Sequence, residues 1–520
     1  MIDWLKNAVF YEIYPQTFAD SNADGIGDFQ GIIDHLDYIK ELGCNAIWMN
    51  PCFESPFNDA GYDVADYCKA APRYGTNADL KRLFDEIHKR DMHILLDLVP
   101  GHTSWDHPWF RESMKVERNE FSGRYIWTDS VWKGFEGVGS IMGFLRGMSD
   151  RDGSVALNFF ASQPSLNYGF NEITDPAWQC SPDSPDAMAT REAMKDVMRF
   201  WLKLGCDGFR VDMAGSLVKN DPEQKATIAL WQDFRRFLDA EFPNAAMISE
   251  WGQPDRSLEG GFHMDFMLHF GPSHYNDLYH GDNPYFSREG QGNAKAFVDY
   301  YNQCRASTNG EGMICMPSGN HDMERMANWL DPEEVKIVFA FLLSLPGAPF
   351  IYYGDEIGMK YIPGLTSKEG GYNRIGSRTP MQWDSGVNAG FSAAPAHALY
   401  LPIDPDENRP TVENQLAEPN SIYHEVKKLI ALRQSEPALR NEAPVEFLYC
   451  EENAYPLAYR RLGEEGSVLV VLNPSGKEAS FPYAGALGEL LYCNGGRAKL
   501  ENGTLTVPAA SAVFVREISR

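Results

Sequence analysis

Eight short apolar segments recur along residues 8–354, and amphipathic helical patterns lie between several of them. Two clear helical patterns are NADLKRLFDEIHKR (77–90) and AMKDVMRFWLKL (193–204). Repeated strand-then-helix units predict a parallel sheet, and eight such strands are the number that closes a (β/α)8 barrel, an α/β fold of the TIM-barrel type. The predicted strands are AVFYEIY (8–14), NAIWMN (45–50), HILLDLV (93–99), DGFRVDM (207–213), AMISEW (246–251), FHMDFM (262–267), GMICMPSG (312–319) and APFIYYG (348–354).

Two regions depart from this pattern, and 520 residues are too many for one hydrophobic core. A long stretch rich in Gly, Ser, Trp and Phe follows the third strand, which predicts an inserted B subdomain. After the helical pattern 421–434, short strands and turns predict a small antiparallel β-sandwich. The expected domains are the barrel (1–100 and 168–440), domain B (101–167) and domain C (441–520).

Composition excludes several classes of function. The net charge of −27 argues against binding to nucleic acid or to anionic membrane surfaces. No run reaches the ~18 apolar residues of a membrane span, and the first residues lack the pattern of a signal peptide. The nine cysteines form no C-x-x-C pair, which favours free thiols in a reducing compartment. We therefore expect a cytoplasmic protein; the sequence does not indicate its oligomeric state.

Polar residues gather where the predicted strands end. In such a barrel the carboxyl ends of the strands form one face, and that face carries the chemistry. An isolated charge at a strand end is more often solvated, but four acids, two histidines and an arginine on four strands are harder to explain in that way. Burying these carboxylates would be costly without partners or a role. The residues are Asp97 and His102 on the third strand, Arg210 and Asp212 on the fourth, Glu250 on the fifth, and His321 and Asp322 on the seventh.

The spacing of the acids suits a retaining glycosidase. Such an enzyme holds two carboxylates ~5 Å apart, one as the nucleophile and the other as the acid/base. Asp212 and Glu250 lie on neighbouring strands, and Arg210 lies two residues before Asp212 on the same strand face, where it would favour the ionised nucleophile. A metal-dependent hydrolase is the weaker alternative, since no H-E-x-x-H pattern occurs. Asp322, His102 and His321 are expected to bind sugar hydroxyls.

The stretch DSNADGIGD (20–28) resembles the start of an EF-hand loop. An EF-hand would require Glu at its twelfth position, where this chain has Gly31, and the preceding segment favours a strand rather than a helix. A solvated acidic turn is the alternative interpretation. The regular spacing of the oxygens predicts one structural Ca²⁺. Its expected ligands are Asp20, Asn22, Asp24, Asp28 and the carbonyl oxygen of Ile26.

Four motifs resemble, in order, the signature regions of the α-amylase family, glycoside hydrolase family 13. They are DLVPGHTS (97–104), GFRVDMAGS (208–216), ISEWGQP (248–254) and PSGNHDMER (317–325), and QPSLN (163–167) resembles the fifth region. The resemblance covers nearly the whole chain. It implies that Asp212 is the nucleophile, Glu250 the acid/base and Asp322 the transition-state stabiliser, with Arg210, His102 and His321 as supporting residues.

Further motifs resemble one branch of that family, which includes oligo-1,6-glucosidases, α-glucosidases and trehalose synthases. They are the loop 20–28, GYDVADY (61–67) and RTPMQWDSGVNAGFS (378–392). In such relatives the calcium is structural, and the Asp of the GYD motif binds the terminal sugar and pairs with an Arg after strand eight. The resemblance therefore implies that Asp63 pairs with Arg378 or, alternatively, Arg374, and that Tyr62 stacks on the sugar.

The chain departs from the motifs of the family at three places, which bear on the number of calcium sites and on the linkage specificity. Gly101 replaces the usual Asn that binds a second calcium, so a single calcium site is expected. Met213 is neither the Val of α-1,6-specific relatives nor the Ala or Thr of α-1,4-specific ones. Region three reads EWGQP in place of the ETPG-like sequence of the α-glucosidases, so the motifs do not assign the linkage. The resemblance implies a retaining exo-acting α-glucosidase acting on short maltose- or isomaltose-type α-glucosides through a covalent glucosyl–Asp212 intermediate. The alternatives are a transglucosylase or isomerase of the trehalose-synthase or sucrose-isomerase type, and, less favoured because all three acids are present, a non-catalytic interaction subunit.

Overall fold

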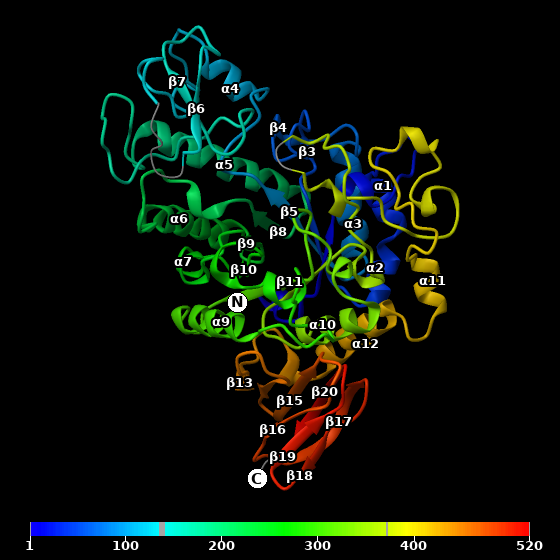
Figure 1. The fold of residues 1–520 in the computed structure, drawn as a ribbon. Helices are drawn as coiled ribbons and strands as arrows, with labels where there is room; N and C mark the ends of the chain where they lie inside the picture. The colour runs from blue at the N-terminus through cyan, green and yellow to red at the C-terminus, as the bar shows by residue number, and fades with distance from the viewer. Residues whose placement is uncertain (1, 135–140, 371–372, 519–520) are drawn as a thin grey trace.

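Eight parallel strands close into a barrel at the centre of the protein (Figure 1). The computed structural model describes residues 2–134, 141–370 and 373–518. The strand order around the barrel is β1-β12-β11-β10-β9-β8-β5-β2, and each predicted apolar segment contains one of these strands, so the predicted (β/α)8 barrel is confirmed. The strands are β1 (Phe10–Ile13), β2 (Ala46–Met49), β5 (His93–Leu98), β8 (Gly208–Val211), β9 (Ala246–Ser249), β10 (Met264–Phe266), β11 (Met313–Pro317) and β12 (Pro349–Tyr352).

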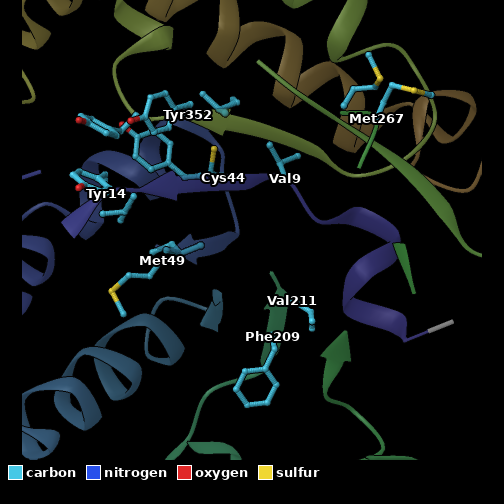
Figure 2. Packing of buried hydrophobic residues seen from close by; sticks show 14 of the residues in the cluster. Val9, Tyr14, Cys44, Met49, Phe209, Val211, Met267 and Tyr352 are labelled. Carbon is cyan, nitrogen blue, oxygen red and sulfur yellow. The ribbon is translucent and has the colours of Figure 1, made fainter. Parts of the chain in front are cut away.

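The barrel strands are buried on both faces, which explains why they are almost continuously apolar. Successive side chains alternate between the barrel interior and the surrounding helices. In β1, Phe10 belongs to the interior cluster and stacks on Phe350 at 4.3 Å, whereas Tyr11 and Ile13 belong to the outer cluster. Figure 2 shows part of that outer cluster.

Helices follow most barrel strands and surround the barrel (Figure 1). Several begin at side chains that satisfy the free backbone N–H groups of the first turn, such as the capping boxes at Thr76 of α3 and Asp331 of α10. Among the described residues, no helix combines the length and apolarity needed to cross a bilayer. The helices are α1 (Phe29–Asp34), α2 (Leu36–Leu42), α3 (Asn77–His88), α5 (Pro185–Leu204), α6 (Lys225–Glu241), α7 (Pro254–Glu259), α8 (Asn276–Tyr279), α9 (Lys295–Ser307), α10 (Pro332–Leu342), α11 (Val412–Ala417) and α12 (Ile422–Ser435).

Two smaller units, one between β5 and β8 and one at the C-terminus, lie at opposite ends of the barrel in Figure 1. Between β5 and β8 the chain forms α4 (Pro108–Ser113) and the antiparallel pair β6 (Gly143–Arg146) and β7 (Ser154–Leu157). A second short pair, β3 (Phe53–Glu54) and β4 (Asp66–Ala70), follows β2.

The C-terminal unit is antiparallel, as predicted. A five-stranded sheet has the order β13-β14-β15-β20-β17, and a three-stranded sheet has the order β16-β19-β18. The two sheets share a buried apolar cluster. The strands are β13 (Val445–Tyr449), β14 (Leu457–Gly463), β15 (Gly466–Asn473), β16 (Ala479–Pro482), β17 (Leu487–Asn494), β18 (Lys499–Glu501), β19 (Thr504–Val507) and β20 (Ser511–Glu517).

Candidate active site

A cavity of about 480 Å³ lies at the carboxyl ends of the barrel strands. Its lining includes six of the site residues predicted from the sequence, while four others do not line it. The lining residues are Tyr62, His102, Asp212, Glu250, Asp322 and Arg374, and the others are Asp63, Arg210, His321 and Arg378.

The guanidinium group of Arg210 contacts the carboxylates of both Asp212 and Glu250. Arg210 Nη1 lies 3.3 Å from Asp212 Oδ1 and 2.9 Å from Asp97 Oδ1, and Nη2 lies 3.0 Å from Glu250 Oε1. The side chain of Arg210 is 3% exposed, so these charges interact with little screening by water. Asp212 and Glu250 are therefore held by the same cation at the ends of adjacent strands, an arrangement suited to a nucleophile and an acid/base.

The electrostatics of Asp212 differ from the sequence-based expectation. Burial raises the pKa of Asp212, the neighbouring Glu250 carboxylate raises it further, and Arg210 only partly opposes them. The pKa of Asp212 consequently lies well above its ordinary value, although the predicted contact with Arg210 is present.

The turn after Asp212 has a feature that no sequence motif signals. Met213 has a φ of 44°, a left-handed conformation that is uncommon for residues other than glycine. In this conformation its backbone N–H donates a hydrogen bond to Glu250 Oε2 at 3.3 Å. The residue after the candidate nucleophile thus helps to orient the candidate acid/base.

Asp322 is surrounded by positive charge. Arg374 Nη1 lies 2.9 Å and Arg378 Nη2 2.6 Å from Asp322 Oδ1. Burial alone would raise the pKa of Asp322, but His321, Arg374 and Arg378 together hold it well below its usual value. Arg378 is fully buried and also pairs with Glu369, so it supports Asp322 from behind and does not line the cavity.

The predicted pairing of Asp63 with Arg378 or Arg374 is wrong. Asp63 is fully buried, and its carboxylate accepts hydrogen bonds from Ser55 Oγ and from the backbone N–H groups of Asn58 and Asp59 at 2.9–3.1 Å. The chain folds back between residues 55 and 63, which places these donors around Asp63. These contacts close the turn between Ser55 and Asp63.

The acid that pairs with the arginine is Asp59, four residues earlier. Asp59 lines the cavity, forms an ion pair with Arg374 and accepts a hydrogen bond from Gln163 Nε2 at 2.7 Å. Burial raises the pKa of Asp59 to about 6, although Arg374 and Arg378 act in the opposite direction. Arg374 therefore connects Asp59 to Asp322 across one part of the cavity wall.

Both candidate histidines are engaged by protein groups. His102 Nε2 lies 3.0 Å from the Tyr62 carbonyl oxygen, and its Nδ1 lies 2.9 Å from Asn158 Nδ2. His321 Nδ1 lies 2.9 Å from Glu12 Oε1, and its Nε2 lies 2.7 Å from the Tyr62 hydroxyl. Burial lowers the pKa of His102 to about 4 and that of His321 well below its usual value, so both are neutral at pH 7. One face of the Tyr62 ring is stacked on the His321 ring, with centroids 5.4 Å apart, and Tyr62 also lines the cavity.

The rest of the lining combines uncharged polar side chains, namely Asn158, Gln163, Ser216, Gln224 and Gln253, with apolar ones. Met142 and Phe270 are 65% and 57% exposed at the rim, and Phe159, Trp251 and Leu268 also contribute. These side chains supply surface for stacking or for excluding water, in contrast to the charged groups around Asp322.

The loop 20–28 joins β1 to α1. Gly25 has a φ of 92°, which permits the sharp turn, and Asp20, Asn22 and Asp24 each accept hydrogen bonds from backbone N–H groups of the same loop. Asp28 accepts the N–H of Gly31 at 2.7 Å and so caps α1. Within the described ranges, no three His, Cys, Asp or Glu side chains gather as a metal site. The loop nevertheless presents only hard oxygen donors, the ligand type that Ca²⁺ prefers.

The closed barrel and the two carboxylates on adjacent strands define a barrel enzyme of the glycoside hydrolase type. Residues 12–442 match the family described as alpha amylase, catalytic domain, and the chain belongs to that family.

Curated relatives fall within the branch that the motifs resemble. The chain is 32% identical over 541 residues to the trehalose synthase/amylase TreS of Mycobacterium tuberculosis, covering 90% of this chain and 82% of the relative. It is 30% identical over 550 residues to the oligo-1,6-glucosidase of Parageobacillus thermoglucosidasius, covering 92% of each. The family therefore includes glucosidases and trehalose synthases among the relatives of this chain.

Solved structures extend the comparison to a trehalulose synthase and an isomaltulose synthase. The trehalulose synthase MutB from Pseudomonas mesoacidophila MX-45 superposes with a TM-score of 0.83 at 25% identity, covering 99% of each chain. An isomaltulose synthase from Erwinia rhapontici NX5, solved in complex with D-glucose, gives the same TM-score, identity and coverage.

Proposed function

We propose that the protein is a retaining, exo-acting α-glucosidase that removes single glucosyl units from short α-glucosides. The observation that carries this proposal is the ion pair between Asp59 and Arg374 in the cavity lining. A carboxylate–guanidinium pair is geometrically fixed and offers both donors and acceptors to the hydroxyls of one terminal sugar. Because Arg374 also contacts Asp322, the same wall reaches the reacting sugar.

The reaction follows from the roles proposed for the three acids. Asp212 attacks the anomeric carbon while Glu250 gives a proton to the leaving glycosidic oxygen, so one C–O bond forms as the other breaks. Glu250 then takes a proton from a water molecule, whose oxygen bonds to the anomeric carbon as the bond to Asp212 breaks, and both side chains are restored. The low pKa of Asp322 keeps its carboxylate ionised, which allows it to accept hydrogen bonds from sugar hydroxyls and to oppose developing positive charge.

Transfer of the glucosyl unit to a sugar is the second candidate function, in the manner of a trehalose synthase or sucrose isomerase. It is favoured by the apolar lining residues Phe159, Leu268 and Phe270, since apolar surface that retains the leaving sugar and excludes water promotes transfer. The names of the relatives include both glucosidases and synthases. Product analysis on maltose, isomaltose, sucrose and trehalose separates the two: free glucose supports hydrolysis, and isomeric disaccharides support transfer.

The exo-acting proposal is tested with maltotetraose and starch. The wild type is expected to release only glucose from maltotetraose and to leave starch nearly untouched. Asp59→Ala should raise KM and lower kcat on disaccharides, because it removes a sugar contact and part of the wall together. Early release of maltose or longer fragments from starch by the wild type would mean an open groove and would contradict the proposal.

We also propose that the loop 20–28 binds one structural Ca²⁺. Asp20, Asn22, Asp24, Asp28 and the carbonyl oxygen of Ile26 would hold it, and the ion would supply stability rather than chemistry. The regular order of oxygen donors and the turn at Gly25 support this proposal.

A further inference from the structure

A fully buried lysine without an acidic partner lies beside the candidate active site. Lys219 is 0% exposed, and none of the ion pairs among the described residues includes it. Its Nζ donates to the Ser216 carbonyl oxygen at 2.7 Å and to Asn158 Oδ1 at 3.2 Å. Burial lowers the pKa of Lys219 to about 7. Burying an ammonium group without a carboxylate partner raises the free energy of the folded state.

Lys219 determines which way the Asn158 amide faces. Below a pH of about 7 Lys219 is mainly an ammonium group, which only donates hydrogen bonds, so the amide oxygen of Asn158 points to Lys219 and the amide nitrogen points away from it. That nitrogen lies 2.9 Å from His102 Nδ1. Asn158 is 1% exposed and lines the cavity beside His102.

The orientation of Asn158 in turn fixes the protonation of His102. Because Asn158 Nδ2 donates, His102 Nδ1 must accept and therefore carries no proton. The proton of the neutral ring is then on Nε2, which donates to the Tyr62 carbonyl oxygen at 3.0 Å. A single tautomer and a single ring position follow from this series of contacts.

Gly101 provides the space for this arrangement. A Cβ atom at Gly101 would lie 2.8 Å from Asn158 Nδ2, closer than the two atoms can approach. The absence of a side chain at residue 101 and the amide of Asn158 are therefore complementary, and a larger residue at 101 would displace the donor to His102.

We propose that Lys219 and Asn158 are positioning residues for the sugar-binding wall: Lys219 orients the Asn158 amide, and Asn158 holds His102 in its Nε2–H tautomer. Lys219 also bonds the carbonyl of Ser216, in the loop that follows Asp212, and so connects that loop to the segment after β7. The kinetic consequences rest on the proposed function; the tautomer of His102 does not.

The test uses full-length protein labelled with ¹⁵N-histidine. Long-range ¹H–¹⁵N spectra report the tautomer of each imidazole, and the spectrum of His102→Gln identifies the signal of His102. The wild type should show Nε2–H only. Lys219→Met should let the Asn158 amide rotate, which gives a mixture of tautomers and lowers kcat/KM by about 10- to 100-fold, the range expected for a misplaced active-site wall.

Asn158→Asp gives an opposite and sharper readout. The introduced carboxylate cannot donate to His102 Nδ1, so that nitrogen should gain a proton. Lys195→Met is the matched control, because Lys195 is also buried but pairs with Asp233 on α6. This control should leave the tautomer of His102 and kcat/KM unchanged.

The outcomes separate positioning from simple stabilisation. If Lys219→Met and Asn158→Asp both keep the wild-type Nε2–H signal and lose only thermal stability, the proposal is overturned. If the tautomer changes as expected but the protein does not act on α-glucosides, the positioning role stands and the proposed function fails.

Discussion

Asp265 is a buried carboxyl group next to the candidate acid/base, and no sequence motif marks it. It is fully buried at the centre of β10, and its Oδ1 accepts hydrogen bonds from Ser249 Oγ at 2.7 Å and from the N–H of Trp251 at 3.0 Å. Its Oδ2 is buried without a hydrogen-bond partner among the described residues. Burial raises the pKa of Asp265 to about 7, so the folded protein holds this proton more tightly than the unfolded chain does.

The sign of the resulting pH dependence is fixed by linkage. A raised pKa contributes stability that is present below the unfolded value near 3.8 and is lost as the pH rises to about 7. Asp265→Asn should remove this pH dependence, which amounts to up to about 4 kcal/mol in the free energy of unfolding. The variant should therefore gain free energy of unfolding relative to the wild type between pH 5 and pH 8, measured by urea unfolding. Parallel pH curves for the two proteins would show that Asp265 does not titrate in this window.

Residues at strand ends were predictable from the sequence, whereas those in long loops were not. Asp212 and Glu250 directly follow barrel strands, so the period of the strands places them at one face. The choice between Asp59 and Asp63 depends on how the loop before β4 folds back, and Arg374 is more than 300 positions further along the chain. No local pattern encodes that contact.

At the scale of elements, the proposed Ca²⁺ in the loop between β1 and α1 would stabilise the fold without taking part in the reaction. Ca²⁺ at 100 times its Kd should add about 2.7 kcal/mol to the free energy of unfolding and raise the Tm, because only the folded loop gathers the ligands. Chelation should lower the Tm and largely spare the rate at moderate temperature.

A pair of variants isolates the loop. Asp24→Ala should abolish the Ca²⁺-dependent rise in Tm, whereas Asp34→Ala, at the exposed end of α1, should retain it. Calorimetric scans with and without Ca²⁺ measure both. An equal Tm in the two conditions for the wild type would remove the calcium proposal, and immediate loss of activity without unfolding would point to a catalytic metal.

The elements themselves followed the sequence closely where the pattern was regular. The eight barrel strands alternate with helices, and burial on both faces makes them apolar throughout. The helical pattern 193–204 is only the last part of α5 (Pro185–Leu204), whose start is set by Ser184 as N-cap and Pro185 at the first helical position. Apolar periodicity reports the buried part of a helix and misses its capped end.

At the scale of the whole molecule, two buried arginines lie where the barrel meets the C-terminal sheets. Arg433 of α12 donates to the carbonyl oxygens of Leu343 and Leu345 at 2.7 and 2.8 Å. Arg461 of β14 donates to the carbonyl oxygens of Ser344 and, at 2.6 Å, Arg440. These arginines satisfy backbone acceptors that the junction would otherwise bury unpaired.

Arg461→Met should therefore destabilise the protein by about 2–5 kcal/mol, because it leaves several buried carbonyl groups without donors. The neighbouring Arg460 is the matched control: it lies on the same strand, pairs with Glu517 and Glu446 and is 26% exposed. Arg460→Met should cost much less. Thermal unfolding of both variants measures the difference, and equal losses would argue against a special role for the junction.

The central claim is that Asp212 carries the glucosyl unit covalently, and trapping that intermediate tests it most directly. Trypsin cleaves after Arg210 and Lys219, so the peptide 211–219, VDMAGSLVK, contains Asp212 as its only acidic side chain. After reaction with a mechanism-based fluoroglucoside, mass spectrometry should find one fluoroglucosyl group on this peptide of the wild type. The corresponding peptide of Asp212→Asn should carry no label, and the turnover of this variant should be lower by several orders of magnitude. Labelling of a different peptide, or a product of inverted anomeric configuration by NMR, would contradict the account.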